Sequence, residues 1–140
     1  MPIEVRDTDG GLGNLFIYSG IIEEKEIIDV VARHHSQDND ILKQYKYSLS
    51  DLTAVEKIEL STKTVEYIAK FTKKTASINP DVIISIVADN DLTFGLSRML
   101  GLLRSDTNWD EMVFRNRVDA ENWTKEMVKT KFGIENITFQ

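Results

Sequence analysis

Val82-Ile83-Ile84-Ser85-Ile86-Val87-Ala88 is the stretch of sequence that decides the fold. Nearly every residue in it is apolar and most are β-branched, which is typical of a strand covered on both faces. Such a strand belongs to a parallel sheet with helices on either side. It is far too short to span a membrane, which takes about 20 apolar residues.

The segments on either side of this stretch alternate between strand and helix patterns. The predicted strands cover 3–6, 15–19, 45–49, 82–88 and 112–115, and the predicted helices cover 23–34, 61–76, 91–103 and 119–131. This alternation predicts an α/β fold with right-handed crossovers and a mostly parallel sheet of about five strands and about four helices. We expect the first strand to pair antiparallel at an edge, because a glycine-rich turn joins it to the second.

The bulk composition limits the class of protein. The chain has 140 residues, 41% hydrophobic and 29% charged, which suits a single domain over 1–140. It has no cysteine, which excludes disulfides, thiolate metal sites and a cysteine nucleophile. A net charge of −6 without a Lys/Arg cluster argues against nucleic acid and anionic membranes as partners. The N-terminal residues lack the order of a signal peptide, so a cytoplasmic location is expected.

The sharpest local motif is Ala88-Asp89-Asn90-Asp91-Leu92-Thr93, directly after the buried strand. It resembles the first motif of the haloacid dehalogenase phosphohydrolases, in which the first aspartate is the nucleophile, the second an acid/base, and magnesium quenches the charge. Only residues 94–140 follow, too few for the strands that carry that family's other motifs. The simpler interpretation is that Asn90 or Asp91 caps the next helix and Asp89 ends the strand.

Two other polar patterns fail as binding motifs. Gly11 and Gly13 lack the third glycine of a dinucleotide-binding turn and lie in a predicted hairpin. His34 and His35 have metal-ligand chemistry, but adjacent helical side chains diverge by about 100°. Histidines in a last helical turn also interact favourably with the helix dipole. We predict no metal and no cofactor and, without a complete catalytic motif, no enzymatic activity.

The helix over 91–103 carries a long apolar stripe. We assign to its buried face the residues Leu92, Leu96, Met99, Leu100 and Leu103. Phe94 and Leu102 lie off this stripe, where they line a pocket or interface or cover the sheet edge.

Several stretches resemble parts of one superfamily. The segment 51–61 follows a strand and opens a helix, as does the strand–loop–helix signature of STAS domains, which include anti-sigma factor antagonists. The segments 94–99, 113–116 and 120–123 are similar to the SpoIIAA-like group of small bacterial proteins within that superfamily. The resemblance runs from roughly residue 18 to 132, and the element order agrees.

This resemblance implies a non-enzymatic regulatory module that binds a protein partner through Glu59 and Ser61. In anti-sigma antagonists the loop carries an Asp-Ser pair whose serine is phosphorylated. Here Glu59 and Leu60 hold those positions and Ser61 lies one position late, so Ser61 is expected to cap the following helix. Asp51 matches the aspartate that precedes the loop and is expected to order it by accepting backbone N–H bonds.

The related Sec14-like proteins imply an alternative function, which is binding of a small apolar or lipid-like ligand between the helices and the sheet. Open α/β sheets bind ligands at the carboxyl ends of their strands. Asp51, Asp89, Phe94 and Arg98 are expected near that rim, where Arg98 meets an anionic headgroup or forms a surface salt bridge. A magnesium-dependent phosphohydrolase using Asp89 and Asp91 is the third hypothesis. A homodimer is compatible with each of the three.

Overall fold

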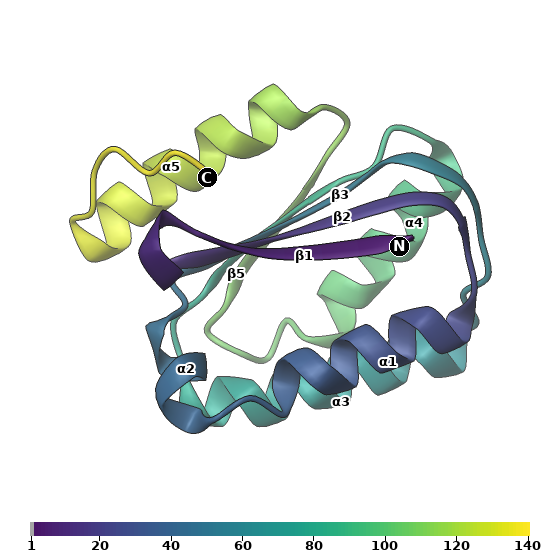
Figure 1. The fold of residues 1–140 in the computed structure, drawn as a ribbon, viewed down its shortest axis with the longest axis horizontal. Helices are drawn as coiled ribbons and strands as arrows, with labels where there is room; N and C mark the ends of the chain where they lie inside the picture. Colours follow the sequence, from purple (N-terminus) through teal and green to yellow (C-terminus); the bar gives the residue numbers. More distant parts are fainter. Residues whose placement is uncertain (1) are drawn as a thin grey trace.

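The computed structural model describes residues 2–140, which form a five-stranded sheet between two layers of helices (Figure 1). The strands, which lie side by side in chain order, are β1 (Ile3–Thr8), β2 (Gly13–Ile22), β3 (Tyr47–Ile58), β4 (Ile83–Val87) and β5 (Asp110–Phe114). The α-helices are α1 (Glu24–His35), α2 (Asn39–Gln44), α3 (Thr62–Ile78), α4 (Asp91–Leu103) and α5 (Arg117–Phe132), and a short 3-10 turn, η1, covers Asp9–Gly11.

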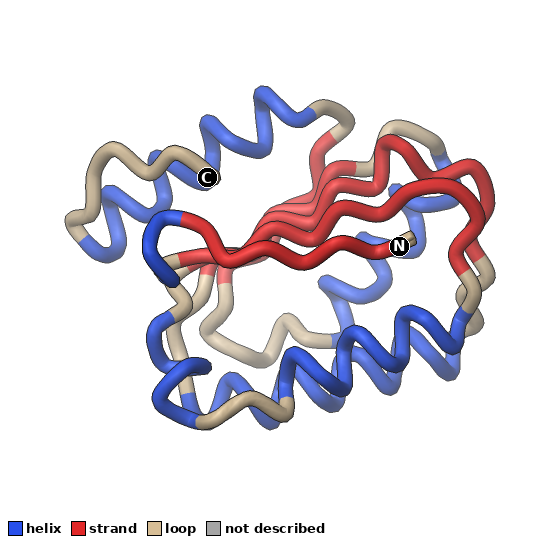
Figure 2. The backbone as a smooth tube through the Cα atoms, viewed as in Figure 1, coloured by secondary structure: helices blue, strands red, loops and turns tan. Residues whose placement is uncertain are grey.

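The helices divide unequally between the two faces of the sheet. Helix α5 and the C-terminal tail cover one face, and α1, α3 and α4 cover the other (Figures 1 and 2). Strand β1 pairs antiparallel with β2, and all the other strand pairs are parallel. The α/β class, the mostly parallel sheet and the antiparallel edge strand predicted from the sequence are therefore confirmed.

Strand β4 is the buried strand that the sequence predicts. It pairs with β3 on one side and β5 on the other, and all five of its residues are buried. Alternate side chains enter two different apolar clusters. Ile83 and Val87 pack towards α5, whereas Ile84 and Ile86 pack on the opposite face.

Strand β3 is much longer than predicted. The sequence predicts a strand over 45–49 followed by a loop, but the strand runs from Tyr47 to Ile58 and stays paired with β2 to its end. Two register shifts in the β2–β3 pairing interrupt the period-two alternation, which explains why the pattern there looks like a loop. The far ends of β2 and β3 lead into α1 and α3 (Figure 1).

Helix boundaries follow from capping side chains. Ser61 Oγ accepts from Thr64 N at 3.3 Å and Asn90 Oδ1 accepts from Thr93 N at 2.9 Å, as the sequence predicts for Ser61 and Asn90. Asn116 caps α5 in the same way, so α5 begins two residues before its predicted start. The short helix α2 was not predicted.

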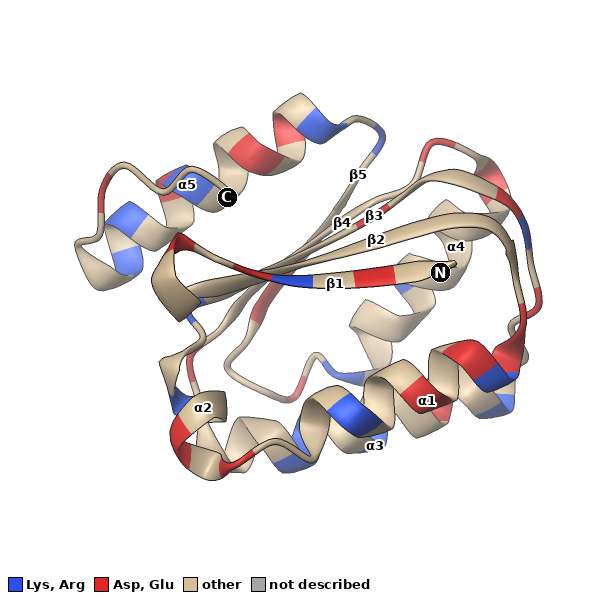
Figure 3. Cartoon of the chain, viewed as in Figure 1, with Lys and Arg blue, Asp and Glu red and all other residues tan. Residues whose placement is uncertain are grey.

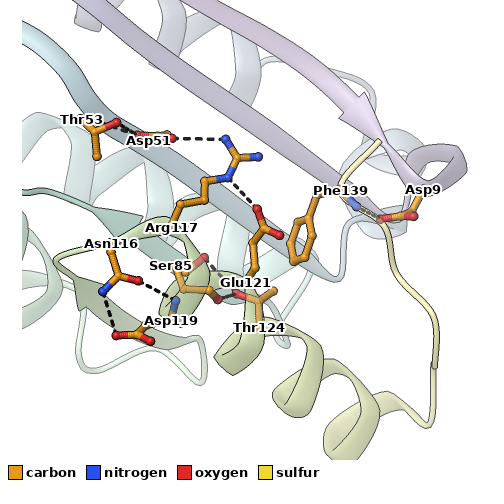
Figure 4. A network of polar contacts seen from close by, with 11 residues as sticks. Asp9, Asp51, Thr53, Ser85, Asn116, Arg117, Asp119, Glu121, Thr124 and Phe139 are labelled. Atoms are coloured by element: carbon orange, nitrogen blue, oxygen red, sulfur yellow. Dashed lines mark hydrogen bonds and ion pairs between the residues drawn. The ribbon is translucent and has the colours of Figure 1, made fainter.

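The α5 face is closed by polar contacts as well as by apolar packing. Thr124 Oγ1 donates to Ser85 Oγ at 3.0 Å in the buried centre of this layer (Figure 4). The C-terminal tail returns to η1, where Thr138 N donates to Asp9 Oδ1 at 2.8 Å. Charged residues lie mainly on the helices, on the edge strand β1 and on the connections between elements (Figure 3).

Candidate functional site

A cavity of about 140 Å³ lies between the sheet and the layer formed by α1, α3 and α4. An apolar cavity of about this size binds benzene in an engineered protein, so the space matches a small organic molecule. The wall is mostly aliphatic and aromatic, with a few polar side chains among them. This composition is typical of ligand sites, in which apolar contacts supply area and a few polar groups fix the orientation.

Small side chains create this space. Asn14, Phe16 and Tyr18 alternate along β2 towards the cavity, and Ser48 and Ser50 lie next to Asn14 and Phe16 on β3. Thr93 and Ser97, both buried, line the cavity from α4. Because serine and threonine stand where larger core residues would fill the layer, the sheet and the helix are separated by unfilled volume.

The residues of α4 that face the cavity differ in part from those predicted to be buried. The sequence assigns Leu92 and Leu103 to the buried face, but these side chains are 63% and 37% exposed. The assignment is wrong for these two leucines, whereas the predicted Leu96 and Leu100 do face the cavity. They share the inward face with Thr93, Ser97 and Arg104.

Arg104 is the polar anchor of the cavity wall. It caps the C-terminus of α4 and is only 7% exposed. Its Nε donates to Glu111 on β5 and its Nη1 donates to Thr72 Oγ1 on α3 at 3.0 Å. The side chain thus joins the two helices and the edge strand that surround this end of the cavity. Sequence reasoning missed it because a basic residue at a helix C-terminus usually serves the helix dipole.

Two adjacent histidines, His34 and His35, line the cavity from α1. Gln37 Nε2 and Asn14 Nδ2 approach His34 Nδ1 at 3.2 and 3.5 Å. His35 Nδ1 lies 2.6 Å from Thr75 Oγ1. The two rings contact each other edge-on, and both are held inside the layer instead of at a solvated helix end.

Burial keeps both histidines neutral. It lowers the pKa of His34 to about 4, against a small opposing effect of Asp7. It lowers the pKa of His35 to about 3, with further contributions from His34 and from the charge of Arg104. The positive charge nearby and the loss of solvent contact act in the same direction on His35.

These pKa values predict that acid destabilises the fold. An unfolded histidine has a pKa of about 6.5, so the unfolded chain takes up protons that the folded chain does not. The stability contributed by the neutral histidines is present above pH 6.5 and is lost as the pH falls towards 4. We expect each histidine to lower the free energy of unfolding by about 2 kcal/mol between pH 7 and pH 5, or about 4 kcal/mol for the two together. Urea denaturation at each pH measures this, and the variant His34→Gln should show a shallower dependence; equal slopes would refute it.

The six residues singled out from the sequence lie elsewhere. None of Asp51, Glu59, Ser61, Asp89, Phe94 or Arg98 lines the cavity. Asp51 faces α5, because it is one position out of phase with Ser50 and Leu52 on the cavity face. Its Oδ2 pairs with Arg117 Nη1 at 3.2 Å, and its Oδ1 accepts from Thr53 N at 2.9 Å (Figure 4). Asp51 therefore accepts a backbone N–H bond, as predicted, but it does so inside strand β3 and not in the loop that the sequence predicted.

Glu59 and Ser61 lie at the exposed start of α3. Ser61 N donates to Glu24 Oε1 at 2.6 Å, and Thr64 Oγ1 donates to the same oxygen at 2.7 Å. Hydrogen bonding by the Ser61 side chain, then by Thr64 and by Ser61 N, lowers the pKa of Glu24 and keeps a negative charge beside Ser61. A phosphate on Ser61 would face that carboxylate, and the repulsion between the two negative charges disfavours a switch based on phosphorylation of Ser61.

The remaining predicted residues lie around the exposed side of α4. Asp89 is exposed after β4, and Asp91 is almost fully exposed in an ion pair with Arg115 at 3.0 Å. The Arg115 guanidinium also lies 4.0 Å from the centre of the Phe94 ring. Phe94 and Arg98 line a shallow groove between α4 and β5, apart from the cavity.

Comparisons with known proteins support the fold. No known protein family matches the chain by sequence, and no curated protein does. The structure is similar to the crystal structure of an uncharacterized protein of the DUF3478 family with a SpoIIAA-like fold from Shewanella loihica PV-4. The TM-score is 0.50 and the identity 14%, over 87% of this chain and 91% of that chain. The chain has a SpoIIAA-like fold.

The SpoIIAA-like fold was the one that the sequence resemblance implied, and at this identity the likeness extends to the fold alone. Within residues 2–140 no helix is long and apolar enough to cross a membrane. Nor does this part of the chain bring together three or more histidine, aspartate or glutamate side chains in a way that could hold a metal ion.

Proposed function

We propose that this SpoIIAA-like domain binds a small, mainly apolar ligand in the cavity beneath its sheet. The cavity itself is the observation that carries the proposal. A well-packed layer has few voids larger than a water molecule, whereas this one keeps about 140 Å³ empty behind polar residues that point inward. Empty volume of this size costs stability, and a ligand that fills the cavity would offset that cost.

Toluene is the simplest probe of this site. We expect toluene to shift the backbone amide signals of residues around the cavity in an NMR titration and to raise the melting temperature. A titration to the solubility limit of toluene that leaves these signals unchanged would contradict the proposal.

A pair of variants on α4 makes the test specific. Ser97 is buried on the cavity face, so Ser97→Leu should fill the space, raise the free energy of unfolding by about 1 kcal/mol and abolish toluene binding. Arg98 is exposed beside it, so Arg98→Leu should leave binding unchanged. Equal binding by the two variants would place the ligand outside the cavity.

A protein-interaction role is the second candidate. It is supported by the exposed position of Glu59 and Ser61 at the start of α3, where the sequence resemblance puts the partner contact. The carboxylate of Glu24 beside Ser61 argues against control by phosphorylation, so we rank this role below ligand binding. Replacing Glu59 with lysine should abolish recovery of a partner in a pull-down without lowering the melting temperature, and unchanged recovery would count against it.

A further inference from the structure

The guanidinium of Arg104 has unused hydrogen-bonding capacity at the cavity wall. Arginine carries five N–H donors, and only Nε and Nη1 of Arg104 donate to other residues in the described part of the chain. The side chain is more than nine-tenths buried and lines the cavity. Nη2 is not one of the fully buried atoms without a partner, which in the described residues are Asn14 Oδ1 and Glu111 Oε2. Its N–H groups are therefore open to an acceptor from the cavity.

The charge of the cavity wall points to the kind of acceptor. Among residues 2–140, Arg104 is the only Lys or Arg in the wall, and no Asp or Glu lines it. Glu111 pairs with the Nε side of the guanidinium from β5, outside the wall. Within the wall itself, no anion of the described residues therefore competes for the remaining N–H groups of Arg104.

Two further groups lie close to this cation. Tyr18 lines the cavity from β2, and burial raises the pKa of its hydroxyl to about 12 while the charge of Arg104 partly opposes that rise. The hydroxyl is therefore protonated at neutral pH and can donate. The charge of Arg104 also acts on His35, whose ring is neutral and brings no competing charge.

We infer that the cavity binds a small hydrophobic carboxylate, with its charged head on Arg104 Nη2 and the Tyr18 hydroxyl and its apolar body among the side chains of α1, α3 and α4. This inference rests on the proposed function and names the class of its ligand. A carboxylate accepts charge-assisted hydrogen bonds, which are about twice as strong as neutral ones. The aliphatic wall then takes the apolar body of the ligand.

Three probes of nearly the same shape separate this inference from the proposed function. Benzoate carries the charged head, benzamide replaces it by a neutral one, and toluene has no polar head. We expect calorimetry or NMR titration at pH 7 to show benzoate binding at least tenfold more tightly than benzamide. Benzamide binding as tightly as benzoate would overturn the carboxylate head but keep the cavity site. Failure of all three probes would overturn both.

Variants assign the head to its contacts. Tyr18→Phe removes one oxygen, so benzoate affinity should fall at least threefold while toluene affinity stays the same. The double variant Arg104→Met/Glu111→Leu removes the charge without leaving an unpaired carboxylate, and it should abolish the preference for benzoate. If the double variant does not fold, Tyr18→Phe and the three probes on the unaltered protein still decide the question. A preference for benzoate that persists in Tyr18→Phe at full strength and in the double variant would refute the assignment.

Discussion

Replacing Arg104 with methionine is expected to lower the free energy of unfolding by about 3–5 kcal/mol. The guanidinium and the Glu111 carboxylate are both almost fully buried and are bonded to each other. Removing the cation leaves an anion in a low-dielectric layer, and one oxygen of that carboxylate, Oε2, already has no hydrogen-bond partner. Urea denaturation of the variant and the unaltered protein measures the loss.

Two control variants show whether the unpaired charge is the cause. Adding Glu111→Leu to Arg104→Met should recover most of the lost stability, because an apolar pair replaces the ionic one. Arg115→Met breaks the exposed ion pair with Asp91 and should cost less than about 1 kcal/mol. An Arg104→Met variant as stable as Arg115→Met would show that the buried pair does not hold this end of the cavity together.

The second large effect is expected at Gly13 on β2. A Cβ atom added there would lie 2.0 Å from Cζ of Tyr47, whose side chain is fully buried. Tyr47 cannot move aside easily, because its hydroxyl donates to Asp9 and its ring packs edge-on against Phe139. We expect Gly13→Ala to lower the free energy of unfolding by about 3 kcal/mol, the upper end of the range for overpacking.

Gly95 provides the matched control. It lies inside α4 with no atom within 4 Å of an added Cβ. Gly95→Ala should therefore stabilise the protein by about 0.5–1 kcal/mol through the higher helix propensity of alanine. Thermal denaturation of both variants tests the pair, and a Gly13→Ala variant as stable as the unaltered protein would disprove the close packing.

The sequence predicts the strands and helices of this fold better than it predicts the residues that line the cavity. The apolar run at 82–88 and the polar caps Ser61 and Asn90 are local signals, and the structure confirms each of them. Strand β3 was predicted too short because its bulged pairing with β2 hides the alternation. Register shifts depend on the partner strand, so no window of the sequence contains them.

The cavity depends on residues whose types carry weak signals. Ser48, Ser50 and Ser97 are small and polar, and a serine in a strand or helix suggests solvent before it suggests an empty core. On α4 the apolar pattern placed Leu96 and Leu100 correctly but also turned Leu92 and Leu103 inward, because counting apolar residues misses the small polar residues of the inward face. The pattern that could have found it is the i, i+4, i+7, i+11 series of Thr93, Ser97, Leu100 and Arg104, which ends in a cation.

Native mass spectrometry of the protein isolated from its source cells tests the central claim most directly. We expect a bound small molecule that is lost on denaturation and, once released, is detected as a carboxylate anion. The same mass should be absent from the Ser97→Leu variant prepared in the same way. A spectrum of unliganded protein alone, or the same bound mass on Ser97→Leu, would contradict a ligand site in this cavity.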